Sequence, residues 1–380
     1  DISYIIRVCK VKVFISKSKE VFYMLKARNE LATLKPYVPG KPIEDVMREF
    51  GLTEVIKLAS NENPLGCSPV AKEAIIKHLD NLNLYPDGNC TSLKEKIAKL
   101  YSVSPSEVSL SSGSDEMCDL LSKTFLDHGD EVIMADITFP RYISTAVMMG
   151  AVPVIVPLKD FTFDIKGMAD KVTDKTKLIW ICNPNNPTGT MVPTSEIIEL
   201  LDSVSEDVLV VLDEAYREFV TRDDYMMDSE NLLSKYPNLV IMRTFSKAYG
   251  LAALRVGYIL AASSIVTEID KIRGPFNVNS LAQVAAYAAL DDQDFIKKSY
   301  DVNKEGKEYI YKEFDAMNVP YAKSETNHIF FGVEKDAFSI FDALQRAGVI
   351  VRPMGAKHLR VSIGTMEQNK RFIELIKDML

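Results

Sequence analysis

The sequence predicts an α/β fold in which a mostly parallel sheet lies between helices and is followed by a smaller α+β module. Between about residues 63 and 274, short runs rich in Val, Ile and Leu alternate with helical patterns, as in a parallel sheet covered on both faces. The runs are continuously apolar, which is typical of strands buried on both sides. Beyond residue 280 long helical stretches dominate, so we expect a second module there.

Six apolar runs are the expected strands of the larger sheet. They are EVIMA (131–135), VPVIVPL (152–158), KLIWIC (177–182), VLVVLDEAY (208–216), LVIMRTF (239–245) and GYILA (257–261). Ligands of such open sheets bind beyond the carboxyl ends of the strands. The residues that follow each run are therefore the first place to look for a functional site.

The helical segments carry start signals of their own. SLKE at 92–95 has the spacing of a capping box, with Leu93, Ile97 and Leu100 on one face of the expected helix. A second helix is expected to begin near Ser114, with Met117, Leu120, Leu121 and Phe125 on its buried side. In the second module we expect a helix over 336–348 and strands in VIVRPM (349–354) and LRVSIGT (359–365).

Composition and charge argue against several classes of protein. The chain has 45 basic and 53 acidic residues, a net charge of −8, and no lysine-rich block, so a nucleic acid is not an expected partner. No apolar stretch reaches the ~18 residues of a membrane span. The 5 cysteines are scattered and never form CxxC, which indicates neither a disulfide framework nor a metal site. Reduced thiols favour a cytoplasmic protein.

The expected strand ends carry five polar segments. They are SSGSDE (111–116), TFPRY (138–142), CNPNNPTG (182–189), DEAY (213–216) and TFSKAYGLAALR (244–255). Each has an ordinary structural explanation, such as an N-cap or a loop of turn-forming residues. Asp213 is more informative, because a carboxylate that ends an apolar strand needs a cation or strong hydrogen bonds.

Together the five segments fit one ligand, pyridoxal 5′-phosphate (PLP). PLP needs a lysine for its Schiff base, a carboxylate at its ring nitrogen, and a cationic cradle rich in N–H groups for its phosphate. Lys247 and Asp213 supply the first two, and Ser246 and Arg255 reach the phosphate from the same turn as Lys247.

The ordered motifs NENPLG, YPDG, GSDE, NPNNPTG, DEAY, TFSKAYGLAALRVGY and LRVSIGT resemble those of the fold-type I PLP-dependent transferases. Within class I/II the chain looks like the histidinol-phosphate aminotransferase group, from about Leu34 to its C-terminus. The resemblance implies a large PLP-binding domain with a seven-stranded-type sheet over 63–275, a small C-terminal domain over 276–380, and an N-terminal arm over 24–62 that contributes to the small domain and the dimer. Residues 1–23 stay open as an extra strand, a disordered arm or an upstream extension before Met24.

The same resemblance implies residue roles. Lys247 is the Schiff-base lysine, Asp213 pairs with the ring nitrogen, and Tyr216 joins Asn186 in binding the phenolic oxygen O3′; Lys247, Asp213 and Tyr216 form the implied catalytic set. Phe139 stacks on the ring. The implied phosphate cup consists of the backbone at Ser114 and Asp115 with Thr244, Ser246 and Arg255. Tyr85 reaches that phosphate from the other subunit of a homodimer.

Further positions resemble substrate contacts. Arg360 would clamp the anionic end of the amino donor, because a planar guanidinium binds carboxylate or phosphate with two hydrogen bonds. Tyr37 and Arg352 resemble additional anion contacts, and Asn61, together with Asn63 of SNENP, looks like an active-site loop residue. The segment PMGAKHL between Arg352 and Arg360 is shorter than the family usually shows, so the donor stays open between histidinol phosphate and aromatic amino acids.

The expected reaction is transamination between L-histidinol phosphate and 2-oxoglutarate in histidine biosynthesis. An aromatic amino-acid aminotransferase and a PLP-dependent phosphothreonine decarboxylase stay open as alternatives. A non-catalytic PLP-binding sensor domain is a third alternative, against which the acidic balance and the absence of a basic segment of helix-turn-helix size argue.

Overall fold

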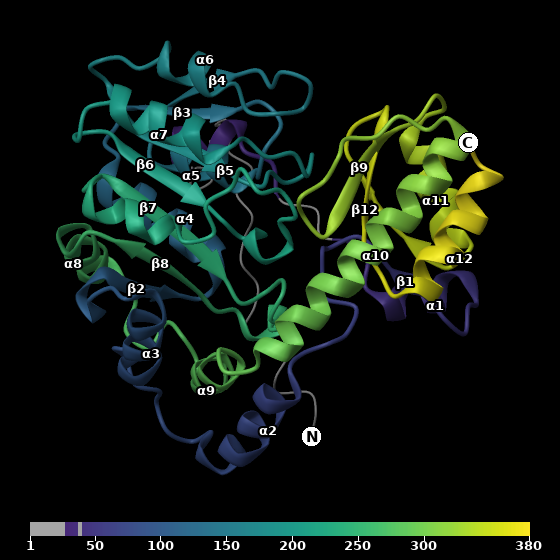
Figure 1. The fold of residues 1–380 in the computed structure, drawn as a ribbon, viewed down its shortest axis with the longest axis horizontal. Helices are drawn as coiled ribbons and strands as arrows, with labels where there is room; N and C mark the ends of the chain where they lie inside the picture. The colour runs from purple at the N-terminus through teal and green to yellow at the C-terminus, as the bar shows by residue number, and fades with distance from the viewer. Residues whose placement is uncertain (1–26, 37–39) are drawn as a thin grey trace, which may run out of the picture.

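The computed structural model describes residues 27–36 and 40–380, which form two bodies joined by a long helix (Figure 1). The predicted segment 1–23 and Tyr37 lie outside the described residues. The larger body contains a 7-stranded sheet and the smaller body a 3-stranded one. No helix in the described part of the chain is both long and apolar enough to cross a membrane.

The large sheet has the strand order β2-β8-β7-β6-β5-β3-β4. Its strands are β2 (Val108–Ser111), β3 (Glu131–Ala135), β4 (Val152–Val156), β5 (Thr176–Cys182), β6 (Leu209–Asp213), β7 (Leu239–Thr244) and β8 (Gly257–Ala261). Only β8 runs antiparallel to its neighbours β2 and β7, so the predicted mostly parallel sheet is confirmed. All six predicted runs form strands. The strand β2 was missed, because VSLS is short and half of its residues are serine.

Burial explains why the central runs are continuously apolar. Every residue of β6, β7 and β8 is buried, since helices cover both faces of the sheet (Figure 1). The helices of this body are α2 (Pro69–His78), α3 (Thr91–Tyr101), α4 (Gly113–Phe125), α5 (Arg141–Met148), α6 (Ile165–Ala169), α7 (Thr194–Ser203), α8 (Ser263–Ile272) and α9 (Ser280–Ala289).

The capping box predicted at Ser92 is wrong. Helix α3 begins one residue earlier, at Thr91, and the Asp87 carboxylate accepts hydrogen bonds from the backbone N–H groups of Asn89 and Thr91. Leu93 and Ile97 are buried as expected, but Leu100 is 48% exposed. The helix expected near Ser114 is α4, and it buries Met117, Leu120 and Leu121.

The smaller body gathers segments from both ends of the described chain. Its elements are α1 (Ile43–Phe50), β1 (Ile56–Lys57), β9 (His328–Gly332), α11 (Ala337–Arg346), β10 (Val349–Ile350), β11 (Arg352–Pro353), β12 (His358–Ser362) and α12 (Met366–Lys377). Strand β1 pairs in parallel with β10, which ties residues before the large sheet to the C-terminal part. Helix α10 (Gln293–Met317) runs from the larger body to the smaller one (Figure 1). The domain boundaries stay a prediction.

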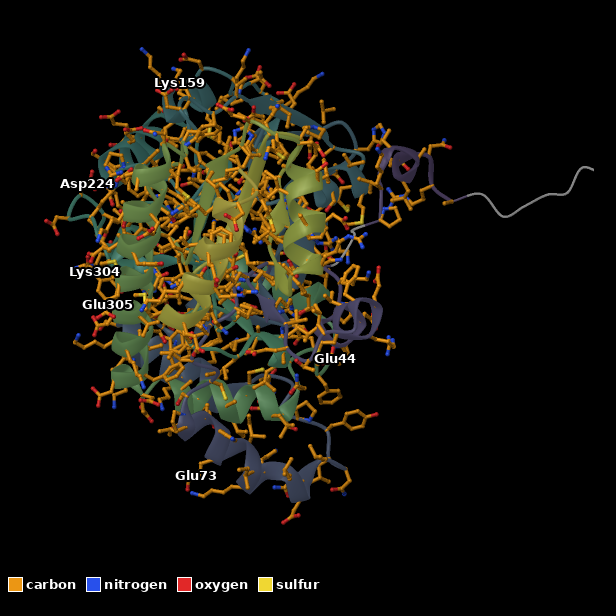
Figure 2. All side chains as sticks on the ribbon, turned by 90° about the vertical axis from the view of Figure 1, so that its right-hand side faces the viewer. Glu44, Glu73, Lys159, Asp224, Lys304 and Glu305 are labelled. Carbon is orange, nitrogen blue, oxygen red and sulfur yellow. The ribbon has the colours of Figure 1, made fainter. Side chains whose placement is uncertain are left out.

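Charged side chains lie at the periphery of both bodies. Figure 2 labels six of them, all exposed: Glu44, Glu73, Lys159, Asp224, Lys304 and Glu305. Ionised groups in the interior are therefore exceptions that need a reason, because an unpaired buried charge is costly. Several of these exceptions lie around one cavity.

Candidate active site

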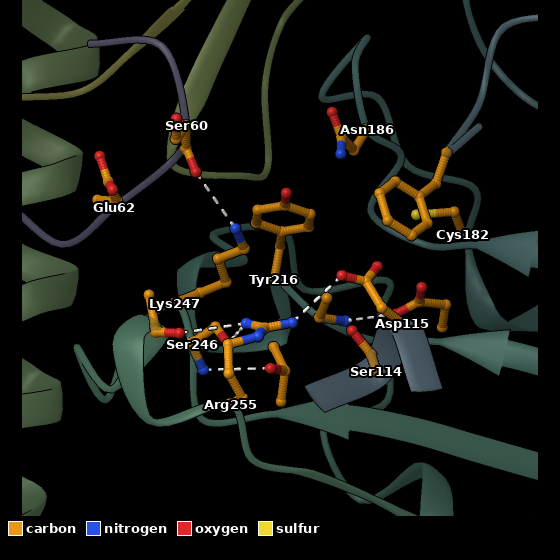
Figure 3. A pocket seen from close by; sticks show the side chains of 15 residues that line it. Ser60, Glu62, Ser114, Asp115, Cys182, Asn186, Tyr216, Ser246, Lys247 and Arg255 are labelled. Atoms are coloured by element: carbon orange, nitrogen blue, oxygen red, sulfur yellow. Dashed lines mark hydrogen bonds and ion pairs between the residues drawn. The ribbon is translucent and has the colours of Figure 1, made fainter. Parts of the chain in front are cut away.

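A cavity of about 380 Å³ lies where the loops after β5, β6 and β7 meet the N-terminus of α4 (Figure 3). It is lined by Ser60, Glu62, Ser114, Asp115, Phe139, Cys182, Asn186, Asp213, Ala215, Tyr216, Thr244, Ser246, Lys247, Ala252 and Arg255. Residues from all five predicted polar segments thus come together, which matches the expected location of ligands at the carboxyl ends of parallel strands.

Lys247 lies in the tight turn that follows β7. The turn closes with a hydrogen bond from Gly250 N–H to the Lys247 carbonyl, and Gly250 has a φ of +69°. A Cβ on Gly250 would collide with the carbonyl oxygen of Gly66, so glycine is required there on both counts. The Lys247 amine lies 3.4 Å from the Ser60 carbonyl oxygen (Figure 3). Burial, together with the positive charge of Arg360, lowers the pKa of this amine to about 8.

Asp213 ends β6 at the bottom of the cavity. Its carboxylate accepts a hydrogen bond from the Tyr142 hydroxyl and a second from the Ala215 backbone N–H at 3.1 Å. Tyr142 is itself held by stacking on Trp180, with ring centroids 4.4 Å apart. Burial raises the pKa of Asp213 to about 6. A cation bound beside the carboxylate would oppose that shift.

Asn186 and Tyr216 present polar groups on another side of the cavity (Figure 3). The Oδ1 atom of Asn186 accepts a hydrogen bond of 2.6 Å from Arg360. The Asn186 Nδ2 group therefore remains as the donor for a ligand. The Tyr216 oxygen accepts a 2.9 Å hydrogen bond from Asn61, which leaves the phenolic proton to be donated elsewhere.

The opposite end of the cavity is suited to an anion. Helix α4 begins at Gly113 without a side-chain cap on its first N–H groups, and such termini attract negative charge. Arg255 reaches across this terminus and contacts Ser246 Oγ at 3.5 Å and Asp115 at 3.2 Å. Ser246 N–H in turn bonds Thr244 Oγ1 at 3.1 Å.

Two glycines keep this end of the cavity open. Gly113 has a φ of +77°, and a Cβ there would lie 2.5 Å from the Arg255 guanidinium. A Cβ on Gly257 would lie 2.9 Å from the Ser114 backbone nitrogen. The cradle therefore depends on backbone that approaches closely, as phosphate-binding loops do.

The two predicted substrate arginines are neighbours in the small sheet. Arg352 of β11 is directly opposite Arg360 of β12 in the antiparallel ladder, so both side chains project from the same face. Arg360 is buried and donates a second hydrogen bond, of 2.6 Å, to the Ala59 carbonyl. Two guanidinium groups on one face favour an anionic ligand.

Five predicted site residues in the described part of the chain do not line this cavity: Asn61, Asn63, Tyr85, Arg352 and Arg360. Tyr85 is 83% exposed and stacks on Phe276, with ring centroids 4.8 Å apart. Its predicted role concerns the phosphate of a partner subunit. Asn63 binds the Ala248 carbonyl and Ser299 Oγ, each at 2.8 Å, and so supports the Lys247 turn from outside.

The sequence prediction assigned no role to several residues that touch or support the cavity. Tyr142 was visible in TFPRY, yet only the fold shows that its hydroxyl contacts Asp213. Ser60 contacts the lysine through its backbone carbonyl, which no side-chain pattern reveals. Glu62 also lines the cavity, in the motif that supplied Asn61 and Asn63.

The described groups fit PLP. The cavity combines a lysine amine, a carboxylate that has no cationic contact within residues 27–36 and 40–380, two donors for a phenolic oxygen, and an uncapped helix terminus beside Arg255. Phe139 also lines the cavity and packs edge-on against Tyr142, with ring centroids 5.5 Å apart. The cavity volume, about 380 Å³, lies within the usual range for small-ligand pockets.

The fold and the cavity define an aminotransferase of the PLP-dependent class. The family model described as aminotransferase class I and II matches residues 53–376, and the chain belongs to this family. The predictions of the family and of an aminotransferase are thereby confirmed.

Within this family, the chain is similar to proteins named histidinol-phosphate aminotransferase. A Caldicellulosiruptor saccharolyticus protein named histidinol-phosphate aminotransferase is 45% identical over 93% of this chain and 99% of its own. One from Carboxydothermus hydrogenoformans, named histidinol-phosphate aminotransferase 2, is 46% identical with the same coverage. The Sinorhizobium meliloti histidinol-phosphate aminotransferase, solved in complex with PLP, is 26% identical, with a TM-score of 0.86 over 94% of this chain and 99% of that one. The predicted fold type is confirmed.

Proposed function

We propose that this protein is a PLP-dependent aminotransferase that transfers the amino group of L-histidinol phosphate to 2-oxoglutarate in histidine biosynthesis. The observation that carries the proposal is the meeting of Lys247, Asp213 and the uncapped terminus of α4 in one cavity. The names of the relatives at 45% and 46% identity support the choice of donor.

The roles of the chain's own residues follow from their positions. PLP supplies an electron sink that stabilises negative charge on the substrate carbon. Lys247 Nζ would hold the cofactor and would move the proton at the substrate carbon; its pKa of about 8 leaves part of the amine neutral near neutral pH. Asp213 holds a proton on the ring nitrogen, and Tyr142 keeps that carboxylate oriented.

The remaining contacts orient the cofactor. Asn186 and Tyr216 donate to its phenolic oxygen, and Phe139 covers its ring. The phosphate is bound by the following groups: the N–H groups of Ser114 and Asp115, the hydroxyls of Thr244 and Ser246, and the Arg255 guanidinium.

The substrate is held at the rim. Arg360 and Arg352 project from one face of the small sheet and bind the anionic end of either substrate. Asn61 and Tyr37 are proposed to complete this end of the site. Histidinol phosphate carries a phosphate ester where an amino acid carries a carboxylate, so a pair of guanidinium groups suits it.

A homodimer in the cytoplasm is part of the proposal. Tyr85 stacks on the exposed Phe276, and the exposed side chains of Leu82 and Leu84 are close to it in sequence. Such a patch favours contact with another protein surface. In the proposed dimer Tyr85 binds the phosphate in the partner's cavity. Mixing Tyr85→Phe with Lys247→Ala subunits should then restore one complete site per mixed dimer.

A donor screen tests the function. Purified protein with PLP and 2-oxoglutarate is supplied with histidinol phosphate, phenylalanine, tyrosine or phosphothreonine, and glutamate and CO2 are both measured. Glutamate formation with histidinol phosphate supports the proposal. Preference for phenylalanine that survives Arg352→Ala would instead indicate an aromatic aminotransferase, and CO2 release from phosphothreonine would indicate a decarboxylase.

A further inference from the structure

We infer that Ser362 and Asn327 are positioning residues that fix the side chain of Asn61, so that the Tyr216 hydroxyl can donate its proton only into the cavity. The inference rests on the proposed function, in which Tyr216 binds the phenolic oxygen of PLP. It concerns Ser362, which ends β12, and Asn327, which immediately precedes β9; neither lines the cavity.

Asn61 is held by three hydrogen bonds from the smaller body, two with Ser362 of β12 and one with Asn327 just before β9. Its backbone N–H donates to Ser362 Oγ at 2.8 Å, and its Oδ1 accepts from the same hydroxyl at 3.0 Å. Its backbone carbonyl accepts from Asn327 Nδ2 at 2.9 Å. Asn61 is 1% exposed and has a φ of +57°, a conformation that asparagine tolerates better than most residues.

These contacts determine which way the Asn61 amide faces. The Ser362 hydroxyl has one proton, and because its oxygen accepts from the Asn61 N–H, that proton is available for the Asn61 Oδ1 atom. With Oδ1 engaged, the amide must present Nδ2 to the Tyr216 oxygen, 2.9 Å away. In the opposite orientation Nδ2 would donate to Ser362 Oγ, and the buried Ser362 proton would lose its one acceptor among the described contacts.

The direction of this hydrogen bond sets the role of Tyr216. Its oxygen accepts from Asn61, so its own proton is free for an acceptor in the cavity. Figure 3 shows the hydroxyl directed toward the space between Ser60 and Asn186. If the amide turned over, Asn61 Oδ1 would take the Tyr216 proton and compete with the cofactor oxygen for it.

The experiment measures the pH midpoint of the visible absorbance of the bound cofactor. A donor to the phenolic oxygen stabilises its anionic form and lowers the pH at which the bound cofactor loses its proton. Tyr216→Phe should therefore raise the midpoint by about one pH unit, the size expected for one hydrogen bond to a charged group. Ser362→Ala should raise it in the same direction by about half a unit or more, and Asn327→Ala should do so to a smaller extent.

The charged and titratable groups around Tyr216 stay constant in these variants. The Lys247 amine lies 5.7 Å from the tyrosine ring, the His328 ring lies 5.2 Å away, and Arg360 and Asp213 influence the same hydroxyl. Ser109→Ala is the control, because Ser109 is also a buried serine of a sheet and its hydroxyl donates a hydrogen bond to Asp270, away from Asn61. Its midpoint should equal that of the wild type.

Double variants separate positioning from a general structural effect. Adding Ser362→Ala to Tyr216→Phe should shift the midpoint no further. Adding Asn61→Gly to Ser362→Ala should bring the midpoint back down, because the competing acceptor is gone and glycine accepts the positive φ. If Ser362 only stabilised the fold, each double variant should instead show a larger shift of the pH midpoint than its single variants.

Two results would overturn the inference. One is a Ser362→Ala midpoint equal to that of Ser109→Ala while Tyr216→Phe is shifted, which would leave the proposed function standing. The other is an unshifted Tyr216→Phe protein, which would remove Tyr216 as a donor to the cofactor. A wild-type protein that binds no PLP would instead refute the proposed function itself.

Discussion

Replacing Arg255 by alanine should weaken cofactor binding while leaving the fold almost unchanged. Arg255 has the only guanidinium group that lines the cavity beside the α4 terminus, within the described residues. Its ion pair with Asp115 is 3.2 Å long, and both side chains are about half exposed, at 43% and 52%. Exposed pairs of this kind contribute about 0–1 kcal/mol, so the melting temperature of the apoprotein should change little.

The effect on PLP binding should be much larger. A hydrogen bond between Arg255 and a phosphate oxygen is charge-assisted, and its loss costs about 1.5–3 kcal/mol. Since about 1.4 kcal/mol corresponds to a tenfold change, the dissociation constant of PLP should rise by roughly 10- to 150-fold. Removing Arg255 also leaves the Asp115 carboxylate beside the phosphate, which acts in the same direction.

The assay is a titration of apoprotein with PLP, followed by absorbance, together with a thermal melt of each apoprotein. Arg255→Lys should lie between wild type and Arg255→Ala, because lysine keeps the charge but not the planar fork. Arg222→Ala is the matched control, since Arg222 forms an exposed pair with Asp224 away from the cavity. Unchanged PLP affinity in Arg255→Ala would refute the assignment of this end of the cavity to phosphate.

Further predictions concern the lysine and the buried carboxylate. Lys247→Ala should abolish transamination and the covalent attachment of PLP without unfolding the protein; an adduct at the cavity that borohydride still traps would contradict this role. Asp213→Asn should retain PLP but lose orders of magnitude in kcat, because a neutral amide cannot hold the ring nitrogen protonated; a near-normal rate would exclude Asp213 from the reaction. In the apoprotein the folded-state pKa of Asp213, about 6, lies above its ordinary value of 3.8, so the native state binds more protons between these pH values and stability should fall as pH rises through this window. Melting curves from pH 3.5 to 7 should therefore show a downward slope from this group that is absent in Asp213→Asn, and identical slopes would contradict the burial argument.

Much of the large sheet was predictable because its strands are buried on both faces. Such strands are recognised as continuous apolar runs, without alternating apolar and polar residues. Each of the runs EVIMA, KLIWIC and LVIMRTF forms the expected strand. The strand β2 and the start of α3 escaped prediction for local reasons. VSLS has too few apolar residues to stand out, and the Asp87 carboxylate that binds the first N–H group of α3 lies four residues before Thr91.

The sequence by itself determined the inventory of chemical groups and the order in which they occur. A lysine in a short turn, a carboxylate that ends an apolar strand and a Gly-Ser-Asp helix start were each readable, because strand ends of an open parallel sheet converge on one edge. The resemblance of the ordered motifs added the family. These features depend on the local sequence pattern, so they can be predicted without knowing any interatomic distance.

Only the tertiary structure decided how those groups are oriented. Ser362 lies 301 residues from Asn61, and Asn327 lies 266 residues from it, yet their hydrogen bonds set the direction in which Tyr216 donates. The Tyr142 hydroxyl reaches Asp213 across 71 residues of chain. Hydrogen-bond direction and pKa depend on which atoms lie within about 3 Å and on how much water is excluded. Both are set by the packing of segments that are remote in sequence, so no local pattern of residues specifies them.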